Sequence, residues 1–569
     1  MQNSPFSAEI WRRRLRVALG HEPADLVLAG GTIVDVLAGD TYVADVAIAD
    51  GIIAGIGQYP DGLQRIDVSG RWIAPSFIDA HVHTESALVW VPEFARAVVP
   101  HGTGAIVTDP HEIANIAGLP GLEVMREAAR DLPMSISFTI PSCVPASAWE
   151  SPGATFGVAE ITAMAQWPEC VGLGELMSFP DVLAGGDDIA AKLLASQGMR
   201  RDGHAPGLRG PALQAYVGSG PGSDHEATTY AEAEEKLRAG QLVMIREGSS
   251  ARNLEALLPL VTDQTYPRCC FCSDDRDVHA LLHIGHMDHT LRLAIDQGLD
   301  PVRAIRMATW TPAEYWRLEG WGAVAPGFLA NLVVLGDLRA VRVDLTIFKG
   351  KVVAESGVMK ADAMPADVAA PLALLGSVHL APLLLRDMRL DPANARQAVG
   401  VIPGEIATRW LQVEPEIQGD EAVASVGRDL LKLVCVERHH ATGRVGVGYV
   451  QGFGLQRGAL ASSISHDAHN IVAVGADDAD ILRAIAVVAE NDGGLAAVAE
   501  GEVLAQMALP IAGILSDLPL AETAAAYERL EAAARGMGST LPSPFGLLAF
   551  MALSVIPEAR VTDRGFVTV

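Results

Sequence analysis

The chain is poor in cysteine and in long apolar runs, and each shortage excludes a class of protein. Only 6 of its 569 residues are cysteine, and their spacing does not form a disulfide framework. No apolar run reaches the roughly 18 residues that a membrane-spanning helix requires. The basic N-terminal residues lack the apolar core and cleavage site of a secretory signal. We therefore expect a cytoplasmic protein without a membrane partner.

Positive charge is also scarce. Lys and Arg total 42 against 69 Asp and Glu, so the formal net charge is −27 at pH 7. Such a field repels phosphate backbones and anionic lipid headgroups, which excludes nucleic acid as an expected partner. Half of the residues are hydrophobic and a fifth are charged, which is typical of a globular protein. A neutral or cationic small molecule is the favoured ligand.

The pattern along the chain predicts three domains, one of which is split in sequence. Short alternating apolar runs broken by Gly and Asp-Gly occur from Asp25 to Ile73 and again from Ala330 to Val353, as expected for a small antiparallel sheet. A larger domain is inserted between these halves. The predicted boundaries are 1–73 (first part of the β domain, with an N-terminal helical extension), 74–319 (inserted domain), 320–364 (second part of the β domain) and 365–569 (C-terminal α/β domain).

The inserted domain alternates brief apolar strands with amphipathic helices, which predicts a parallel sheet with crossover helices. Its length and rhythm match a (β/α)8 barrel. The fold class is therefore α/β, with a (β/α)8 barrel inserted in a small β-sandwich domain and followed by a C-terminal α/β domain. The predicted barrel strands are Ile73 to Ile78, Ala105 to Thr108, Ser135 to Ile140, Val171 to Leu173, Leu213 to Val217, Val243 to Ile245 and Cys270 to Cys272. In the C-terminal domain we predict a strand at Leu431 to Val436, tight hairpins at Val445 to Gly458, and helices at Asp477 to Glu490 and Glu522 to Arg535.

The most informative stretch is His81-Val82-His83, at the end of a predicted strand. Alternate residues of a strand point to one face, so the two imidazoles can converge on one cation. Polar residues at later strand ends complete a possible metal site: Glu175, His204, His225 and Asp274. Two divalent cations held by these six residues would activate water for hydrolysis. Such ligands suit zinc, iron or manganese, and the sequence does not choose among these metals.

Each candidate ligand also has a purely structural interpretation. The histidines fit buried core positions or surface loops, and Asp274 or Asp275 fits a helix cap. A rival motif, His83-Thr84-Glu85 with Cys269 to Cys272, imitates the zinc nucleobase deaminases. The residue directly before Cys269 is not a proline, and these cysteines are better explained as a buried strand. We therefore favour the histidine and carboxylate cluster.

The order of these residues resembles the amidohydrolase superfamily, and longer stretches are similar to the adenine deaminase family of the bacterial adenine-specific type. The likeness includes the C-terminal domain, which generic amidohydrolases lack. Ser76 and Ala87 depart from the family pattern at positions that are not ligands. The similar segments are Phe77 to Ser86, Pro100 to Thr103, Asp109 to Asn115, Pro141 to Pro145, Gly172 to Met177, Glu437 to Gly443, Gly452 to Gly454, Ser465 to Asn470, Leu509 to Gly513, and Ser516-Asp517.

The resemblance implies hydrolysis of adenine to hypoxanthine and ammonia, a reaction of purine salvage or adenine catabolism. It implies two divalent metals, with manganese or iron preferred and zinc possible, and a hydroxide between them that attacks C6. Asp274 would pass the proton to the leaving amine, so Asp274 and Glu175 are the expected catalytic residues. The implied metal ligands are His81, His83, Glu175, His204, His225 and Asp274.

The residues that bind the purine base are less clearly marked in the sequence. The candidates are Glu85, Asp109, His111, Glu112 and His466. The first four are unranked as the group that protonates a ring nitrogen, and three of them would alternatively cap a helix at Ile113. The C-terminal His439, His440, His466, Asp467 and His469 either close the pocket over the base or form a separate polar network. Apolar C-terminal stretches favour a homodimer or a larger homo-oligomer.

Two other functions compete with this interpretation. The first is hydrolysis of a cyclic amide, such as a dihydropyrimidine or hydantoin, on the same barrel. Glu175 stands against it, because many of those enzymes have a carboxylated lysine there. The second is a non-catalytic barrel that serves as an assembly scaffold, which predicts lost ligands, whereas every expected ligand position is filled here.

Overall fold

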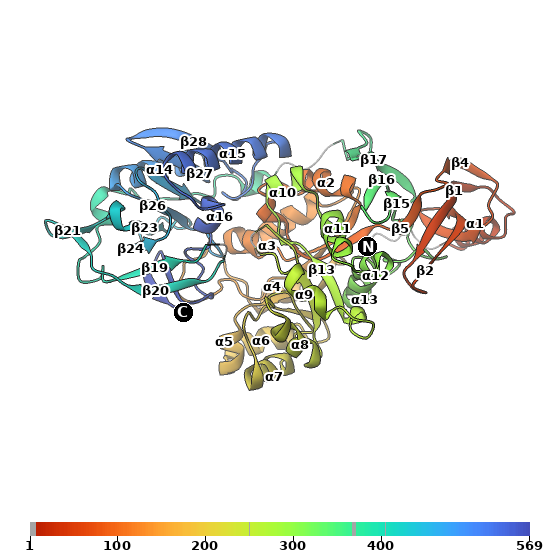
Figure 1. The fold of residues 1–569 in the computed structure, drawn as a ribbon, viewed down its shortest axis with the longest axis horizontal. Coiled ribbons are helices and arrows are strands. Elements are labelled where there is room, and N and C mark those ends of the chain that lie inside the picture. The colour runs from red at the N-terminus through yellow and green to blue at the C-terminus, as the bar shows by residue number, and fades with distance from the viewer. Residues whose placement is uncertain (1–6, 250, 367–370, 404) are drawn as a thin grey trace.

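Three bodies lie in a row along the long axis of the molecule, with the barrel between the other two (Figure 1). The computed structural model describes residues 7–249, 251–366, 371–403 and 405–569. Within these residues, no helix combines the length and the apolar character that crossing a bilayer demands. The predicted fold class, a barrel with a small β domain and a C-terminal α/β domain, is confirmed.

The small β domain is one nine-stranded sheet that draws strands from both sides of the barrel in sequence. The strand order is β18-β17-β16-β15-β5-β1-β2-β3, and β4 pairs with β1. Strand β5 pairs antiparallel with β15, which joins the two halves. The helix α1 (Ala8–Ala18) packs beside β2 and β3. The strands are β1 (Ala24–Asp35), β2 (Asp40–Ala49), β3 (Ile52–Gly57), β4 (Gly62–Asp67), β5 (Trp72–Pro75), β15 (Leu332–Asp337), β16 (Arg342–Phe348), β17 (Lys351–Glu355) and β18 (Val358–Met359).

The barrel strands are parallel and fall into two hydrogen-bonded groups, β10-β9-β8-β7-β6-β14 and β11-β12-β13. Backbone bonds at Gly222 connect the groups, because its N–H donates to Arg201 O and its carbonyl accepts from Leu242 N. The strands β13 and β14 form one broken strand, so the ring closes where β14 pairs with β6. The strands are β6 (Phe77–His83), β7 (Thr103–Thr108), β8 (Ser135–Ile140), β9 (Cys170–Leu176), β10 (Arg200–Gly203), β11 (Ser223–Asp224), β12 (Leu242–Arg246), β13 (Cys269–Cys272) and β14 (Asp274–Asp275).

Helices surround the barrel and cover the outer faces of its strands. Every residue of β6, β7, β12 and β13 is buried, as expected for parallel strands enclosed on both faces. The helices are α2 (Val91–Val98), α3 (His111–Ala128), α4 (Val158–Met164), α5 (Phe179–Ala184), α6 (Asp187–Ala195), α7 (Gly210–Gly218), α8 (Tyr230–Arg238), α9 (Leu254–Leu257), α10 (Val278–His283), α11 (Met287–Asp296), α12 (Pro301–Met307) and α13 (Trp310–Trp316).

One predicted barrel strand is wrong, and another is right only at its end. The segment Leu213 to Val217 lies in helix α7, where Leu213 and Tyr216 bury one helical face. Pro211 in the first turn favours the helix, because its missing N–H costs nothing there. The segment Ile73 to Ile78 contains two strands, β5 of the small sheet and β6 of the barrel. The true fifth and sixth strands, β10 and β11, are short and polar, so they carry no apolar signal.

The C-terminal domain is a mixed sheet covered by two long helices. Its strand order is β20-β19-β24-β23-β26-β25-β27-β28. The predicted strand and both predicted helices are confirmed, but the segment predicted as hairpins contains one seven-residue strand, β24. The elements are β19 (Gln397–Val401), β20 (Thr408–Gln412), β21 (Glu416–Gln418), β22 (Glu421–Val423), β23 (Leu430–Val436), β24 (Val445–Gln451), β25 (Ala459–Ser462), β26 (Ile471–Gly475), α14 (Asp478–Glu490), β27 (Gly494–Ala499), β28 (Glu502–Ala508), α15 (Leu520–Gly536), α16 (Pro544–Leu548), β29 (Ala559–Thr562) and β30 (Gly565–Thr568).

A buried lysine braces the loops that follow β10 and β11. The Nζ of Lys236 donates to Ala205 O at 2.9 Å, to Asp224 Oδ1 at 2.7 Å and to Glu232 Oε1 at 2.8 Å. We expect Lys236→Met to lower the free energy of unfolding by roughly 3–5 kcal/mol, because two buried carboxylates would lose their counterion. Urea unfolding tests this. The exposed Arg238→Met is the control, and an unchanged midpoint for the lysine variant would contradict the prediction.

Candidate metal centre and substrate pocket

His81 and His83 lie at the carboxyl end of β6, on the same side of the strand. Their Nε2 atoms are 3.2 Å apart, and both side chains are buried. The Nδ1 of His83 donates to Asp109 O at 2.9 Å, so its Nε2 carries the lone pair. The alternation of side chains along a strand therefore brings two nitrogen ligands to one point.

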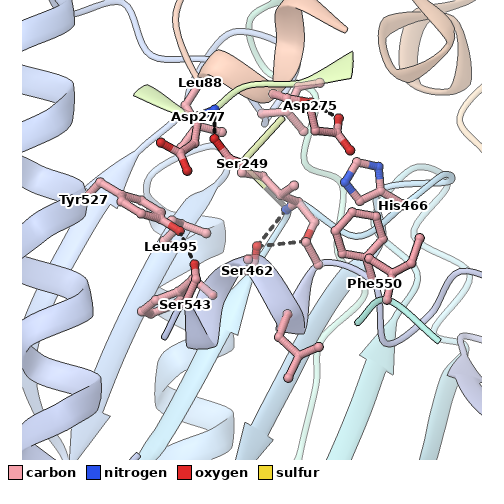
Figure 2. A pocket seen from close by; sticks show the side chains of 18 of the residues that line it. Leu88, Ser249, Asp275, Asp277, Ser462, His466, Leu495, Tyr527, Ser543 and Phe550 are labelled. Carbon is pink, nitrogen blue, oxygen red and sulfur yellow. Dashed lines mark hydrogen bonds between the residues drawn. The ribbon is translucent and has the colours of Figure 1, made fainter. Parts of the chain in front are cut away.

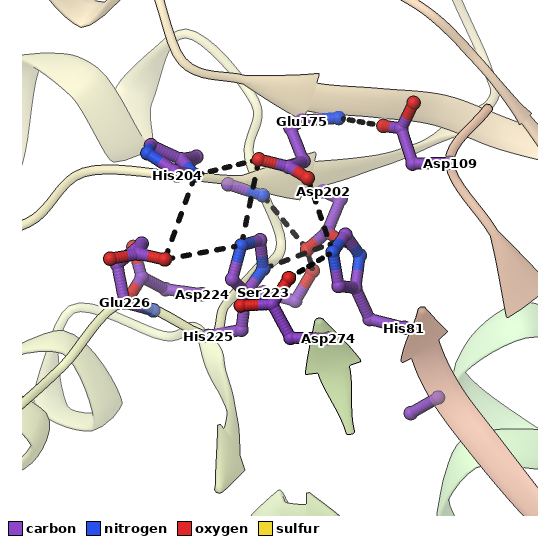
Figure 3. Close-up of polar contacts among 12 residues, drawn as sticks. His81, Asp109, Glu175, Asp202, His204, Ser223, Asp224, His225, Glu226 and Asp274 are labelled. Atoms are coloured by element: carbon purple, nitrogen blue, oxygen red, sulfur yellow. Dashed lines mark hydrogen bonds and ion pairs between the residues drawn. The ribbon is translucent and has the colours of Figure 1, made fainter. Parts of the chain in front are cut away.

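Glu175, near the end of β9, connects two groups of ligands (Figure 3). Its Oε1 lies 3.1 Å from His81 Nε2 and 2.7 Å from His83 Nε2. Its Oε2 lies 2.6 Å from His204 Nδ1 and 3.6 Å from His225 Nε2. The two oxygens thus face different histidine pairs, so Glu175 belongs to both ligand groups.

The donor atoms of this cluster fit divalent metal ions. Among the described residues, Glu175 Oε1, His204 Nδ1 and His225 Nε2 are buried and make no hydrogen bond within the protein. Buried polar atoms without a partner are costly, and cations bound in the two ligand groups would satisfy these three atoms. The separations match the ligand edges of a site with metal–ligand distances of about 2.0–2.2 Å. The candidate groups are His81, His83, Glu175 and Asp274 on one side, and Glu175, His204 and His225 on the other.

Asp202, at the end of β10, contacts one histidine from each group. Its Oδ2 lies 2.8 Å from His81 Nδ1 and 3.6 Å from His225 Nδ1. Its Oδ1 accepts from Ser223 Oγ at 2.6 Å. The carboxylate is fully buried and faces the Nδ1 atoms of both rings, while their Nε2 atoms face Glu175.

We expect Asp202→Ala to weaken the affinity for divalent metal by roughly 10–100-fold, because both rings would lose the carboxylate that orients them. Competition against a chelator measures this affinity. The exposed Asp187→Ala on α6 is the matched control. Equal metal affinity of the Asp202 variant and the unchanged protein would disprove the orienting role.

Asp274 reaches the same cluster from β14. Its Oδ1 lies 3.1 Å from His83 Nε2, and its Oδ2 accepts from Arg246 Nη1 at 2.5 Å. Arg246 also binds Glu226, with Nη2 3.2 Å from Oε2. Burial would raise the pKa of Asp274, but the charge of Arg246 and contacts with the histidines hold that pKa well below its usual value. Its backbone φ of +57° is rare for a residue other than glycine, and such strain is typical of functional positions.

A cavity of about 230 Å³ opens between the barrel and the C-terminal domain (Figure 2). Its barrel wall includes Glu85 and Asp275, which follow the ligands His83 and Asp274 closely in sequence. The facing wall is largely apolar and comes from the C-terminal domain, with residues such as Leu495, Ile514, Leu541, Phe545 and Phe550. The cavity is therefore lined by close sequence neighbours of two candidate ligands, and the third domain forms its facing wall.

His466 lies at the junction of these walls. Its ring stacks on Phe550 with centroids 4.5 Å apart, and its Nδ1 is 3.2 Å from Glu112 Oε1. Burial opposes its charge, but Glu112 raises the pKa of His466 to about 9. Burial and the charge of Glu112 together raise the pKa of Glu85 to about 7. The cavity thus holds the ionised carboxylate of Glu112 beside the carboxyl group of Glu85, which binds a proton more readily.

His469 supports Glu112 from the C-terminal side. Its Nδ1 accepts from the backbone N–H of Ser465 at 3.3 Å, so its Nε2 carries the proton. That Nε2 faces Glu112 Oε2 at 3.5 Å. The imidazole is therefore oriented as a donor to the carboxylate.

The remaining predicted residues lie outside the cavity. Asp109 accepts from Glu175 N at 2.7 Å, and His111 lies between Asp109 and Asp467. His439 and His440 contact backbone carbonyls of Ala468 and Pro152 instead.

The helix caps considered for these residues are not found in the structure. Helix α10 is capped by Asp277 rather than by Asp274 or Asp275, and Pro110 occupies the N-cap position of α3.

Sequence reasoning missed three charged residues of the centre. Asp202 precedes Gly203-His204, Glu226 directly follows His225, and Arg246 ends the apolar run of β12. A search for polar residues at every strand end would have found them. Their short or apolar surroundings offered no separate motif.

Comparisons with known proteins place the chain among hydrolases. Residues 72–353 match the amidohydrolase family, and residues 405–569 match the adenine deaminase C-terminal domain. The chain is 45% identical to an adenine deaminase of Dehalococcoides mccartyi (strain CBDB1) and 41% identical to adenine deaminase 2 of Carboxydothermus hydrogenoformans, each over 98% of this chain and 97% of the relative. A solved structure of β-aspartyl dipeptidase from Fervidobacterium islandicum AW-1 matches 61% of this chain and 100% of its own, with a TM-score of 0.46 and 15% identity.

Proposed function

This chain belongs to the adenine deaminase family of amidohydrolases, and we propose that it hydrolyses adenine to hypoxanthine and ammonia at the cluster around Glu175. The observation that supports this location is the division of the Glu175 oxygens between two histidine pairs. The cavity of about 230 Å³ beside this cluster provides space for a planar base.

The proposed ligands would hold two divalent cations, and Glu175 would contribute to both sites. His81, His83 and Asp274 would complete one site, and His204 and His225 the other. When bound, divalent cations lower the pKa of water and polarise the electrophile, which is the chemistry that a hydrolytic deamination needs. Manganese or iron is the proposed metal, with zinc as the alternative, because mixed imidazole and carboxylate ligands suit all three.

Asp274 is the proposed proton carrier. Its Oδ1 faces the ligand cluster, while Arg246 binds its Oδ2 and keeps the carboxylate ionised. The carboxylate accepts a proton from the water that adds to C6 and then delivers a proton to the amine as the C6–N bond breaks. Water supplies the oxygen of hypoxanthine, and the amino group leaves as ammonia.

The purine ring is proposed to lie in the cavity against Glu85, Glu112 and His466. Glu85 is the best placed of the candidates to donate a proton to a ring nitrogen, because it lines the cavity two residues after His83. Glu112, held by His466, would accept a hydrogen bond from a ring N–H. Asp109 and His111 support the centre from behind, since Asp109 binds the Glu175 backbone.

Steady-state turnover after reconstitution with manganese, iron or zinc tests this function. We expect adenine to yield equal amounts of hypoxanthine and ammonia, and we expect no ring opening of a dihydropyrimidine. Activity on adenosine but not on adenine would redirect the substrate assignment. A protein that purifies with substoichiometric metal and converts none of these compounds would instead fit a non-catalytic scaffold.

A further inference from the structure

A second cluster of metal-binding side chains lies on the surface where the barrel meets the C-terminal domain. His279 and His283 occupy successive turns of α10, and Glu528 lies on α15. Figure 1 shows these two helices side by side. The Oε1 of Glu528 is 3.1 Å from His279 Nδ1 and 3.4 Å from His283 Nε2. We propose that these three residues bind one zinc-like divalent cation that links the barrel to the C-terminal domain.

The geometry fits the ligand edges of a tetrahedral site. With metal–ligand distances near 2.0–2.1 Å, ligand atoms lie about 3.3 Å apart. The two measured separations bracket that value, and all three ligand atoms lie within 4.8 Å of one another. Residues four apart on a helix share a face, so the histidine spacing brings both rings to the carboxylate.

The ligand chemistry favours a borderline cation over a hard one. Two imidazoles and one carboxylate suit zinc, nickel or copper, whereas magnesium prefers oxygen ligands and its own water. Three protein ligands leave the fourth position to water. Each side chain is half exposed, so a cation can enter from solvent, and the net charge of −27 favours its approach.

An ordinary surface ion pair explains the contacts less completely. One protonated histidine is enough to pair with a carboxylate, and exposed pairs contribute little to stability. Here two imidazoles are directed at the same carboxylate oxygen, with ring centroids 4.7 Å apart. Two cationic rings at that distance would repel each other. A shared cation would instead be coordinated by both rings and hold them close together.

The position of this surface site connects it to the substrate cavity. Asp277, which caps α10, lines the cavity, and so does Tyr527, the residue before Glu528 on α15. Figure 2 shows these two residues near each other on one side of the cavity, away from His466 and Phe550. A cation between α10 and α15 would therefore fix the side of the cavity to which both helices contribute. None of the three ligands belongs to the cluster around Glu175, so the proposal does not depend on the deaminase assignment.

Equilibrium dialysis of the metal-loaded protein against zinc chloride tests the proposal. We expect one additional zinc per chain, and we expect none when magnesium replaces zinc. The double variant His279→Ala with His283→Ala should lose this extra ion, and Glu528→Gln should weaken its binding at least tenfold. The exposed His21→Ala is the control and should bind like the unchanged protein.

Hydrogen exchange provides the second measurement. Zinc should slow amide exchange in both α10 and α15 of the unchanged protein, and in neither helix of the double variant. Equal zinc stoichiometry of the unchanged protein and the double variant would overturn the site. The link between the domains would be overturned by a different result. In that case zinc binding would need the histidines but be unchanged in Glu528→Gln, and zinc would protect only α10 from exchange.

Discussion

Asp274→Asn is expected to lower kcat for adenine deamination by roughly 10²–10⁴-fold while leaving the fold intact, because asparagine has the same shape but cannot carry a proton. Asparagine retains an oxygen that can accept from Arg246, so the side chain keeps its position. Ammonia release under saturating adenine measures kcat, and metal analysis of the same sample measures the bound ions.

The control for this variant is Asp263→Asn, the same chemical change on a side chain that is 71% exposed. It should turn over adenine like the unchanged protein. A near-normal kcat for Asp274→Asn, with metal content unchanged, would show that another group carries the proton. A loss of kcat that simply follows a loss of metal would assign Asp274 to metal binding alone.

Glu175→Ala is expected to abolish most metal binding and to lower kcat/KM by more than about 10³-fold. The carboxylate faces both histidine pairs, so its removal takes one ligand from each proposed site at once. The loss of transition-state charge stabilisation by a bound metal amounts to several kcal/mol, and each 1.36 kcal/mol is a factor of ten in rate. Metal content per chain and turnover are measured on the same preparation.

Glu169→Ala, next to β9 and partly exposed, is the matched control and should retain both metal and activity. Removing a single histidine should affect metal binding in only one ligand group, because each histidine belongs to one group. If Glu175→Ala binds as much metal as the unchanged protein, the carboxylate is not shared between the groups.

The barrel strands that are apolar were predictable from the sequence, and the polar ones were not. Strands such as β7 and β12 are buried along their whole length, so hydrophobic runs mark them clearly. The strands β10 and β11 are short, with sequences Arg-Arg-Asp-Gly and Ser-Asp, and the helix α7 between them has an apolar run that imitates a strand. The strands β10 and β11 nevertheless join the barrel because β9 and β12 supply their backbone hydrogen-bonding partners.

The candidate ligands came from the sequence because each lies at a strand end, where parallel strands present their side chains to one site. The roles of the neighbouring charged residues could not be predicted from the sequence. Arg246 contacts Asp274, which is 28 positions away, and Asp202 contacts His81, which is 121 positions away. No local spacing in the sequence records such contacts. The homo-oligomer, the cytoplasmic location and the domain boundaries stay predictions.

The order of histidines and carboxylates along the chain, the barrel class and the family were determined by sequence alone, since they depend on residue type and local periodicity. The tertiary structure decided which oxygen of Glu175 faces which histidines, that the C-terminal domain closes the cavity through His466 and Phe550, and that α10 lies against α15. These features arise from side-chain directions and from packing between segments hundreds of residues apart, and such packing depends on the whole folded chain.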